Sequence, residues 1–555
     1  MGLMARDILY HGKFVVMYYG QDYMGTLQAY LGALFFNVFG PTVFALRFGV
    51  VLELTCFLVV MYILSCLLYT RLVGILSLAL LSLGSSEMLH NHVFAGGGSN
   101  EVLLFGALLS LLAAHLALNA SHTRPTPTRR RYASFACWGL LAGLAIWSDP
   151  LVLPFVVMPG VLILRYCWHE RKSLAPFLVT LGFLIGFSPY LIFFATVPRE
   201  QVTNRLLPFS AQLQLVHTPE KTPVVPLPIP EHTQQATQPA SPILPGDQQA
   251  LPFAPLALRL LGLVMVSLPA LSGGMALCPI KPDDAWPLSW HSSPQLLQCS
   301  AIHGLWGLGL ILLWGCAVWL TIRWLRTYRR QTRQQAPPDE TMQRQASIRS
   351  ARLTILVAAG LTTLIYGVSS VSTSPLLHPW NNARYLIALD IATPSLLIVL
   401  WEMLDILKGS PRFLRHFVAG VNVVTLLGVL VVLAQGTLTT LSLRATVQRA
   451  NVQQSQLVAG LENQGIRRFY TDYWTCNRLV FVSQESLTCA VLDDRLQPSL
   501  DRIWSYRTLV YSDPRAAFVF PNNSSMLKAF IQRIAGHEQA FTHSVIGSYV
   551  VYWPV

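Results

Sequence analysis

The chain has 555 residues, of which 53% are hydrophobic and 12% are charged, and its formal net charge is +13 at pH 7. A soluble globular chain carries about 25% charged residues, so this composition excludes an ordinary soluble protein. The basic residues gather in short loops between apolar runs rather than on one face with interleaved aromatic side chains, which argues against nucleic-acid binding.

Ten apolar runs follow one another along residues 1–435, and each is about long enough to cross ~30 Å of hydrocarbon. Because every backbone amide must be satisfied inside lipid, continuous apolar runs predict helices rather than barrel strands. We therefore expect an α-helical polytopic membrane protein. The expected spans are 42–69, 72–86, 102–118, 133–147, 151–166, 175–196, 301–322, 353–371, 386–407 and 416–435.

Charge predicts the orientation of these spans. Four basic loops, at 124–131, 165–172, 323–352 and 408–415, are expected in the cytoplasm. Between the first two, Trp147-Ser148-Asp149-Pro150 supplies an outside turn, since Asp before Pro disfavours helix. This arrangement puts the loops 1–41 and 197–300, together with everything after residue 435, outside the cytoplasm.

Two parts of the outer loops depart from simple spans. Residues 255–271 are apolar but carry Arg259 and Pro269, and we interpret them as an interfacial or re-entrant helix. Residues 218–252 are rich in Pro, Gln and Thr, which predicts a partly extended loop. An outer N-terminal segment without a preceding helix predicts that the natural start lies upstream of Met1.

Beyond residue 435 the hydropathy falls. Residues 442–464 have helical spacing, and short strand-like runs alternate with a helix-like segment after them. This pattern predicts a small extracytoplasmic α/β domain at 436–555. Its expected strands are 467–470, 479–482, 487–492, 508–511, 516–520 and 548–553, and its expected second helix is 526–534.

Four cysteines lie in the segments assigned to the outside: Cys278 and Cys299 in one loop, Cys476 and Cys489 in the C-terminal domain. Two disulfides and four free thiols are both compatible with this placement. The sequence contains no phosphate-binding loop, dinucleotide fingerprint or zinc spacing. We expect no cofactor and no protein-bound metal site, and the use of a divalent metal stays an open question.

Three polar stretches border apolar runs on the outer side, at 18–25, 87–101 and 378–385. Ionisable groups at a membrane boundary are functional candidates because burying them unpaired is costly. Taken singly, each could simply end a helix in water. Taken together, they predict one site at the outer rim of the bilayer, with the candidate residues Tyr19, Gln21, Asp22, His90, Glu101, Asn382, Arg384 and Tyr385.

Several of these residues keep a simpler interpretation. Glu101 opens a helix, where the macrodipole favours a carboxylate. Arg384 could bind a phosphate through two hydrogen bonds, or extend to the interface as an anchor beside Tyr385. His90 and His92 are two residues apart, a poor spacing for one helical metal site, and we interpret them as loop residues.

Some of these stretches resemble a known family. The run YGQDYMGTLQAYLGALF from Tyr19 to Phe35 resembles the first outer loop and following helix of bacterial polyprenyl-phosphate-dependent glycosyltransferases of the GT-C superfold. These are similar to the dolichyl-phosphate-mannose protein mannosyltransferase family. Weaker resemblances lie in Phe39-Gly40, Ala45-Leu46-Arg47, Gly98-Ser99-Asn100-Glu101, Ala383-Arg384-Tyr385-Leu386, Tyr470-Thr471-Asp472-Tyr473-Trp474, Arg478-Leu479 and Phe481-Val482-Ser483.

The resemblance implies an enzyme that moves a sugar from a polyprenyl phosphate to an acceptor hydroxyl on the outer face. An acid of the first outer loop would act as general base, and cationic groups would stabilise the departing lipid phosphate. The family's acidic motif precedes a stretch like residues 2–9 and has no counterpart here. Asp7 and Asp22 lie downstream of its place, so the chain as given could be inactive.

We assign the candidate roles accordingly. Asp22 and Glu101 are the candidate catalytic residues. The expected partners are a polyprenyl-phosphate sugar, membrane lipid and an unidentified envelope or protein acceptor, without nucleic acid. The candidate substrate-binding residues are Tyr19, Gln21, His90, Asn382, Arg384 and Tyr385.

Two other functions stay open. A transporter or flippase of lipid-linked substrates predicts broken helices at mid-membrane and internal repeats, and no repeat is evident in the sequence. A non-catalytic envelope protein, whose C-terminal domain binds a partner, is kept open by the missing acidic motif.

Overall fold

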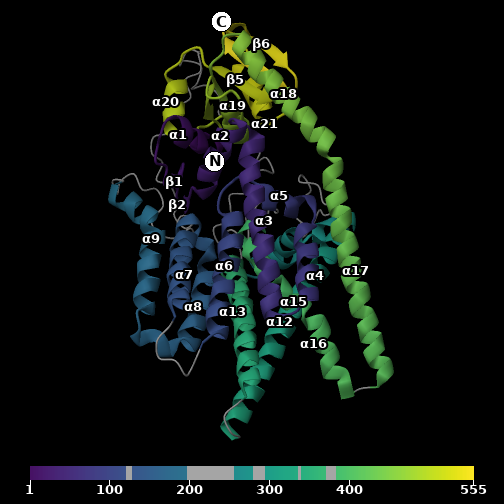
Figure 1. Ribbon diagram of the computed structural model, residues 1–555. Helices are drawn as coiled ribbons and strands as arrows, with labels where there is room; N and C mark the ends of the chain where they lie inside the picture. Colours follow the sequence, from purple (N-terminus) through teal and green to yellow (C-terminus); the bar gives the residue numbers. More distant parts are fainter. Residues whose placement is uncertain (121–127, 197–255, 279–293, 335–338, 370–382, 410) are drawn as a thin grey trace.

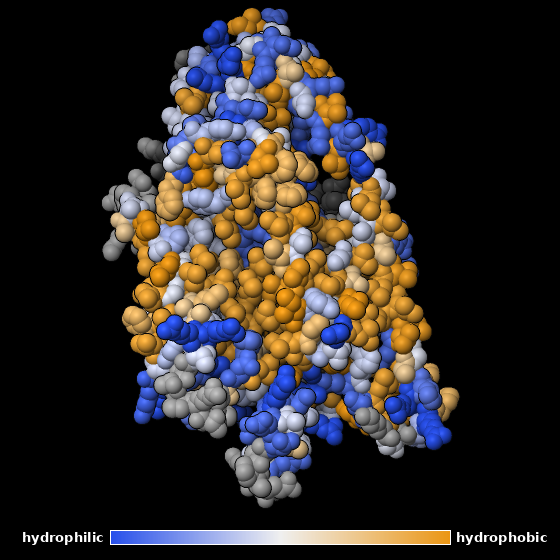
Figure 2. All heavy atoms as spheres, in the orientation of Figure 1, coloured by the Kyte–Doolittle hydropathy of each residue, from blue (hydrophilic) through white to orange (hydrophobic). Residues whose placement is uncertain are grey.

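The computed structural model describes residues 1–120, 128–196, 256–278, 294–334, 339–369, 383–409 and 411–555. Its helices run side by side in a bundle, and a small domain caps one end, with both chain termini toward that end (Figure 1). On the face drawn in Figure 2, a broad hydrophobic belt separates this cap from a polar far end. The expected extended loop at 218–252 lies outside the described residues.

Within the described chain, seven helical segments are long and apolar enough to cross a membrane, and the bent pair α4 and α5 would make an eighth. The multi-pass α-helical class is confirmed. The expected spans at 133–147 and 151–166 form helices that stand in the bundle (Figure 1), but these helices are not among the seven segments that are long and apolar enough to cross a membrane. The seven are α3 (Val43–Leu68), α6 (Ser99–Leu118), α9 (Ala175–Thr196), α12 (Pro294–Gln334), α13 (Glu340–Val368), the run η7 (Arg384–Ala392), α15 (Thr393–Leu397) and α16 (Val399–Ile406), and α17 (Arg412–Ser442), which continues into α18.

The remaining elements of the bundle are shorter. Of the segment 255–271, expected as an interfacial or re-entrant helix, the described residues belong to the apolar helical stretch Leu256–Ser272, which packs against α12 and α13. Its position relative to a bilayer stays a prediction. These elements are α4 (Arg71–Ser82), α5 (Ser86–Val93), α7 (Arg129–Ser148), η1 (Pro150–Val152), α8 (Leu153–Tyr166), η2 (Trp168–Lys172), α10 (Leu256–Gly262), η4 (Leu263–Ser267), α11 (Leu268–Ser272), η5 (Gly274–Leu277) and η8 (Leu407–Gly409).

Helices α7 and α9 pack closely because each presents two glycines one turn apart. Gly139 and Gly143 of α7 face Gly182 and Gly186 of α9, and a Cβ atom at any of the four would come within 2.1 to 2.4 Å of a backbone oxygen of the other helix. Small residues four apart are a common way for membrane helices to approach. This contact fixes the end of α7, where the candidate site begins.

The N-terminal segment fills the space between the bundle and the cap. Leu3 and Phe36 share a hydrophobic cluster with Leu457 and Phe481 of the cap. Arg6 donates from Nη2 to a backbone oxygen of the cap at 3.0 Å and pairs with a carboxylate there at 3.3 Å. The cap is therefore docked on this segment. Its elements are α1 (Gly2–Tyr10), β1 (Met17–Tyr18), β2 (Gln21–Gly25) and α2 (Leu27–Phe39).

The C-terminal domain is the small α/β unit that the sequence predicts. Its five-stranded sheet has the order β4-β3-β5-β7-β6, with β3 parallel to β4 and β5, and with β7 antiparallel to β5 and β6. The elements are α18 (Arg444–Asn463), β3 (Arg468–Thr471), α19 (Tyr473–Val482), β4 (Thr488–Val491), α20 (Trp504–Tyr511), β5 (Ala517–Pro521), α21 (Ser525–Ile534), η9 (Glu538–Ala540), β6 (Phe541–Ile546) and β7 (Tyr549–Pro554).

Two expected strands of this domain are wrong, and one strand was missed. Residues 479–482 and 508–511 are the ends of helices α19 and α20. The side chain of Asp472 accepts hydrogen bonds from the N–H groups of Trp474 and Thr475, and this N-cap outweighs the β-branched and aromatic composition that follows it. Strand β6 was missed because it is a half-exposed edge strand with polar residues.

The two open disulfide pairings are both formed. Cys278 bonds to Cys299, which ties η5 to α12, and Cys476 bonds to Cys489, which ties α19 to β4. The second bond holds α19 against the sheet of the C-terminal domain.

Candidate functional site

A polar cavity of about 290 Å³ lies between the β1–β2 hairpin, the loop after α5, the start of η7 and the C-terminal domain. We call it the junction cavity. Within the described part of the chain, its charged lining residues are Asp149, Arg384 and Arg502. The other polar residues on its wall are Tyr18, Gln21, Tyr23, Ser99, Tyr385, Tyr473 and Ser499.

Asp149 ends helix α7, and its carboxylate faces this cavity. The side chain is 4% exposed, and Oδ1 accepts a hydrogen bond from the N–H of Leu151 at 2.9 Å. Gly98 lies against Oδ2: a Cβ atom there would be 2.2 Å away, and its φ of +79° also favours glycine. No hydrogen-bond donor of the described residues reaches Oδ2.

The electrostatics of Asp149 suit proton transfer. Burial raises the pKa of its carboxyl to about 6, against the lowering effects of the Leu151 N–H and of the Arg384 charge. A general base works best when its pKa lies near the working pH. Asp149 is therefore a carboxylate with one open oxygen that can take up a proton near neutrality.

Arg384 begins η7 on the same wall. Its Nη2 donates to the hydroxyl of Tyr385 at 3.2 Å, and its guanidinium lies 5.1 Å from the centre of the same ring. Nε and Nη1 have no acceptor among the described residues. A planar guanidinium with free donors is suited to bind a carboxylate or phosphate.

Glu101 lies behind the wall rather than on it. It is fully buried, and Oε1 accepts from the N–H of Gln28 at 3.1 Å, while Oε2 accepts from the N–H of Gly98 at 2.8 Å and from Ser148 Oγ at 2.7 Å. These three bonds join α2, the loop at Gly98 and the end of α7. Glu101 thus holds the two neighbours of Asp149 in place.

The other candidates from the sequence divide into two groups. Gln21 and Tyr385 line the junction cavity with Arg384. Tyr19 points away from it, because its hydroxyl donates to Asp7 at 2.5 Å. Asp22 does not line the cavity and lies near Tyr190 of α9.

The last two candidates are His90 and Asn382. His90 does not line the junction cavity, and its ring packs 5.2 Å from that of Phe94, which does. The expectation that His90 and His92 are loop residues is wrong: they belong to α5, whose N-cap Ser85 accepts a hydrogen bond from the N–H of Met88 at 3.3 Å. Asn382 lies outside the described residues.

Sequence reasoning missed two charged residues of the site. Asp149 was interpreted only as part of a turn, although it stands on the same predicted side as Glu101 and Arg384. Its predicted position on the outer side of the membrane, shared with Glu101 and Arg384, could have identified Asp149 as a candidate. Arg502 belongs to the C-terminal domain, and no local motif connects it with the hairpin that it meets.

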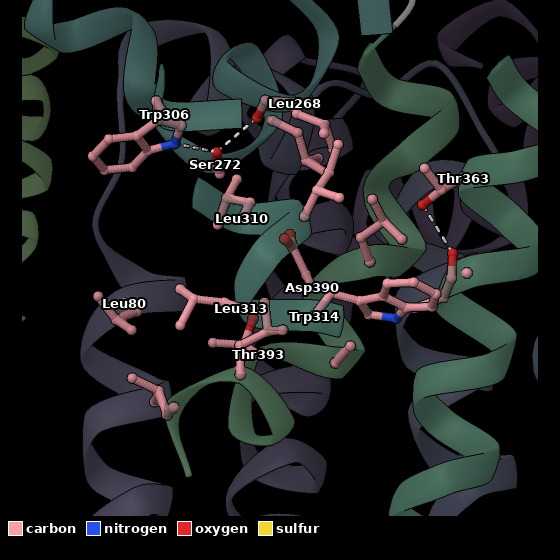
Figure 3. Close-up of a pocket in the computed structure, with 18 of the residues that line it drawn as sticks. Leu80, Leu268, Ser272, Trp306, Leu310, Leu313, Trp314, Thr363, Asp390 and Thr393 are labelled. Atoms are coloured by element: carbon pink, nitrogen blue, oxygen red, sulfur yellow. Dashed lines mark hydrogen bonds between the residues drawn. The ribbon is translucent and has the colours of Figure 1, made fainter. Parts of the chain in front are cut away.

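A second, larger cavity of about 680 Å³ lies inside the bundle, between α4, α10 to α13, η7, α15 and α17 (Figure 3). We call it the bundle cavity. Its lining is mostly leucine, and Asp390 is its charged residue among those described. Asp390 Oδ2 lies 3.0 Å from His92 Nε2. Helix η7 lines both cavities, with Arg384 at the junction cavity and Asp390 at the bundle cavity.

These features define a polytopic membrane protein with a polar cavity below a small α/β domain and an apolar cavity in its bundle. No model of a known protein family matches the chain, and no curated protein sequence matches it either.

Solved structures with a distant likeness exist. ArnT from Cupriavidus metallidurans bound to undecaprenyl phosphate is 13% identical, with a TM-score of 0.48 over 100% of this chain and 92% of that one. The archaeal oligosaccharyltransferase AglB from Archaeoglobus fulgidus, in complex with an inhibitory peptide and a dolichol-phosphate, is 11% identical, with a TM-score of 0.42 over 99% and 69%.

Proposed function

We propose that the protein is a membrane glycosyltransferase that moves a sugar from a polyprenyl-phosphate donor to an acceptor hydroxyl. The observation that carries this proposal is the junction cavity, where Asp149 has an oxygen, and Arg384 has donors, without a hydrogen-bond partner among the described residues. A base and an anion-binding cation are the two groups that such a transfer needs.

In the proposed reaction, Asp149 takes the proton of the acceptor hydroxyl. The hydroxyl oxygen forms a bond to the anomeric carbon of the sugar while the bond from that carbon to the phosphate oxygen breaks. The lipid phosphate leaves with the electron pair, and Arg384 stabilises its charge through hydrogen bonds.

The roles of the sequence candidates follow from their places. We assign Glu101 a positioning role, because its three hydrogen bonds fix Gly98 and Ser148 beside Asp149. Gln21 and Tyr385 remain proposed substrate contacts on the cavity wall. We propose no direct contact with substrate for Tyr19, Asp22 or His90, which lie off that wall.

The bundle cavity supplies a place for the lipid chain. Its leucine lining is about as apolar as the hydrocarbon of a bilayer, so a polyprenyl tail can pass from the membrane into the cavity without a desolvation cost. Because η7 lines both cavities, a donor whose phosphate meets Arg384 could direct its chain along η7 into the bundle.

We also propose an orientation and a division into domains. Basic residues such as Arg165, Arg171 and Lys172 lie in η2 and the end of α8, on loops expected in the cytoplasm. The C-terminal domain at 436–555 would then be extracytoplasmic, next to a glycosyltransferase-like domain at 1–435. The acceptor would be an envelope or protein hydroxyl on the outer face.

The test uses the full chain in lipid nanodiscs, a radiolabelled polyprenyl-phosphate sugar and an envelope fraction as acceptor. The wild type should transfer label, Asp149→Asn should transfer it at least about a hundredfold more slowly, and Asp494→Asn should match the wild type, because Asp494 is exposed on the C-terminal domain. If the wild type neither binds nor transfers the donor, the proposal is wrong. Binding of the donor without any transfer would instead favour a flippase or a non-catalytic protein.

A further inference from the structure

We propose that Arg502 of the C-terminal domain binds the lipid phosphate opposite Arg384, so that the donor site is complete only when this domain is docked. The proposal rests on the function proposed above and names a further binding residue for the same substrate. Its basis is that the two guanidinium groups of the junction cavity come from different parts of the molecule.

The loop that carries Arg502 is tied to the sheet. It connects β4 with α20, and the side chain of the preceding residue, Asp501, accepts a hydrogen bond from the N–H of Val491 at 2.9 Å. Arg502 then extends from the domain toward the hairpin. Its backbone position therefore follows the position of the whole C-terminal domain.

The guanidinium group of Arg502 is held in one orientation. Nε donates to the hydroxyl of Tyr473 at 2.8 Å, and Nη1 donates to the carbonyl oxygen of Tyr19 at 3.4 Å. The group lies 5.0 Å from the ring centre of Tyr18 and 5.6 Å from that of Tyr473. Preorganised groups lose little conformational entropy when a ligand binds.

One nitrogen of this group is left for a ligand. Nη2 of Arg502 has no acceptor among the described residues, and the side chain lines the cavity. A purely structural arginine would be expected to use its donors within the protein. Arg502 instead presents the same kind of open donor as Arg384.

The charge of the cavity identifies the ligand class. Among the residues that the structure describes, its charged lining consists of two arginines and one aspartate, which leaves an excess of positive charge when all three are ionised. A neutral sugar or acceptor gives no compensation for that excess. The phosphodiester of a polyprenyl-phosphate sugar does, because it carries one negative charge, and its oxygens can accept charge-assisted hydrogen bonds from both guanidinium groups.

Docking of the domain and binding of the donor are then coupled. The contacts of the cap with α1, including the Arg6–Glu485 ion pair and the packing of Leu3 in the cluster around Phe481, set the position of Arg502 relative to Arg384. Loss of this docking would remove one of the two phosphate contacts while leaving the bundle cavity in place.

The experiment measures the affinity of the purified full chain in nanodiscs for two probes: an unglycosylated polyprenyl phosphate and the matching neutral polyprenol. The variants are Arg502→Gln, Arg502→Lys, Arg384→Gln and, as a matched control on the same domain, the exposed Arg515→Gln. We expect Arg502→Gln to weaken binding of the phosphate by about tenfold to a hundredfold, with polyprenol binding unchanged. Arg502→Lys should lose less, and Arg515→Gln nothing.

The arms separate the possible failures. If the wild type and Arg384→Gln bind the phosphate equally weakly, the proposed function fails together with this inference. If Arg384→Gln weakens binding but Arg502→Gln equals the wild type, the inference alone is overturned. An equal loss of phosphate and polyprenol binding in Arg502→Gln would also overturn it, since that result would show a structural role.

Discussion

The junction cavity collects its side chains from five separate parts of the chain, whereas the bundle cavity is lined by neighbouring helices, mostly through leucine side chains. The wall of the first depends on single features: a left-handed glycine at 98, a buried carboxylate at 101 and a docked domain. The wall of the second depends on many similar leucines. A substitution at the junction should therefore have a large and specific effect, and one in the bundle a small and graded effect.

The largest expected effect is at Asp149. Asp149→Asn keeps the shape of the side chain but removes the proton acceptor, and the rate of sugar transfer should fall by about 10²- to 10⁴-fold. Donor affinity should change little, because the phosphate contacts remain. Transfer kinetics and lipid binding, measured on the same preparation, check the expected fall in rate and the unchanged affinity. A variant with full transfer activity would show that Asp149 is not the general base.

The next effect is at Arg384, whose removal should act on binding. Arg384→Gln takes away a charge-assisted contact to the phosphate, so the affinity for polyprenyl phosphate should fall by roughly tenfold to a hundredfold. Titration of the lipid against wild type and variant measures this. An affinity equal to that of the wild type would place the phosphate elsewhere.

The pH dependence of transfer sharpens the role of the carboxylate. The pKa of Asp149 is raised to about 6, and the base must be deprotonated to act. The rate should therefore be nearly constant above about pH 7 and fall roughly tenfold for each unit below pH 6. The residual rate of Asp149→Asn should lack this slope, and a variant that keeps the slope would assign it to another group.

The smallest effect is expected in the bundle cavity. Leu313 lines it, while its neighbour Leu312 is exposed on the outside of α12. Leu313→Trp should lower the affinity for a long polyprenyl phosphate by about threefold to tenfold, because it takes up space among the leucines and costs about 1 kcal/mol. Affinity for a short-chain phosphate should not change.

Leu312→Trp provides the matched control for that measurement. It adds the same side chain to the same helix on the face turned away from the cavity, so it should bind both phosphates like the wild type. Equal losses in the two variants would indicate a general disturbance of α12 and would argue against a chain-binding role of the cavity.

The sequence predicts the bundle well because hydropathy is a local property. Each expected span from 42–69 to 416–435 overlaps a helical segment of the described residues, and the α/β character of residues after 435 is confirmed. The short runs at 479–482 and 508–511 were misassigned because four residues are too few to distinguish the helical period from the alternation of a strand. The N-cap that decides for helix α19 lies upstream, at Asp472.

The site was only partly predictable. Gln21, Arg384 and Tyr385 line the junction cavity, and their role as substrate contacts stays a prediction. The sequence could not distinguish Glu101 from a residue of the cavity wall. Its carboxylate oxygens accept hydrogen bonds from α2 and α7, and these contacts form only when the helices pack around it. Arg502 could not be predicted from the sequence, because it reaches the junction cavity only through the docking of the C-terminal domain.

A cryo-electron microscopy map of the full chain in nanodiscs with bound polyprenyl phosphate tests the central claim most directly. We expect phosphate density in the junction cavity, within hydrogen-bonding distance of the Arg384 and Arg502 side chains, and chain density that continues past Asp390 into the bundle cavity. Phosphate density at the opposite end of the bundle, with the junction cavity empty, would contradict the account.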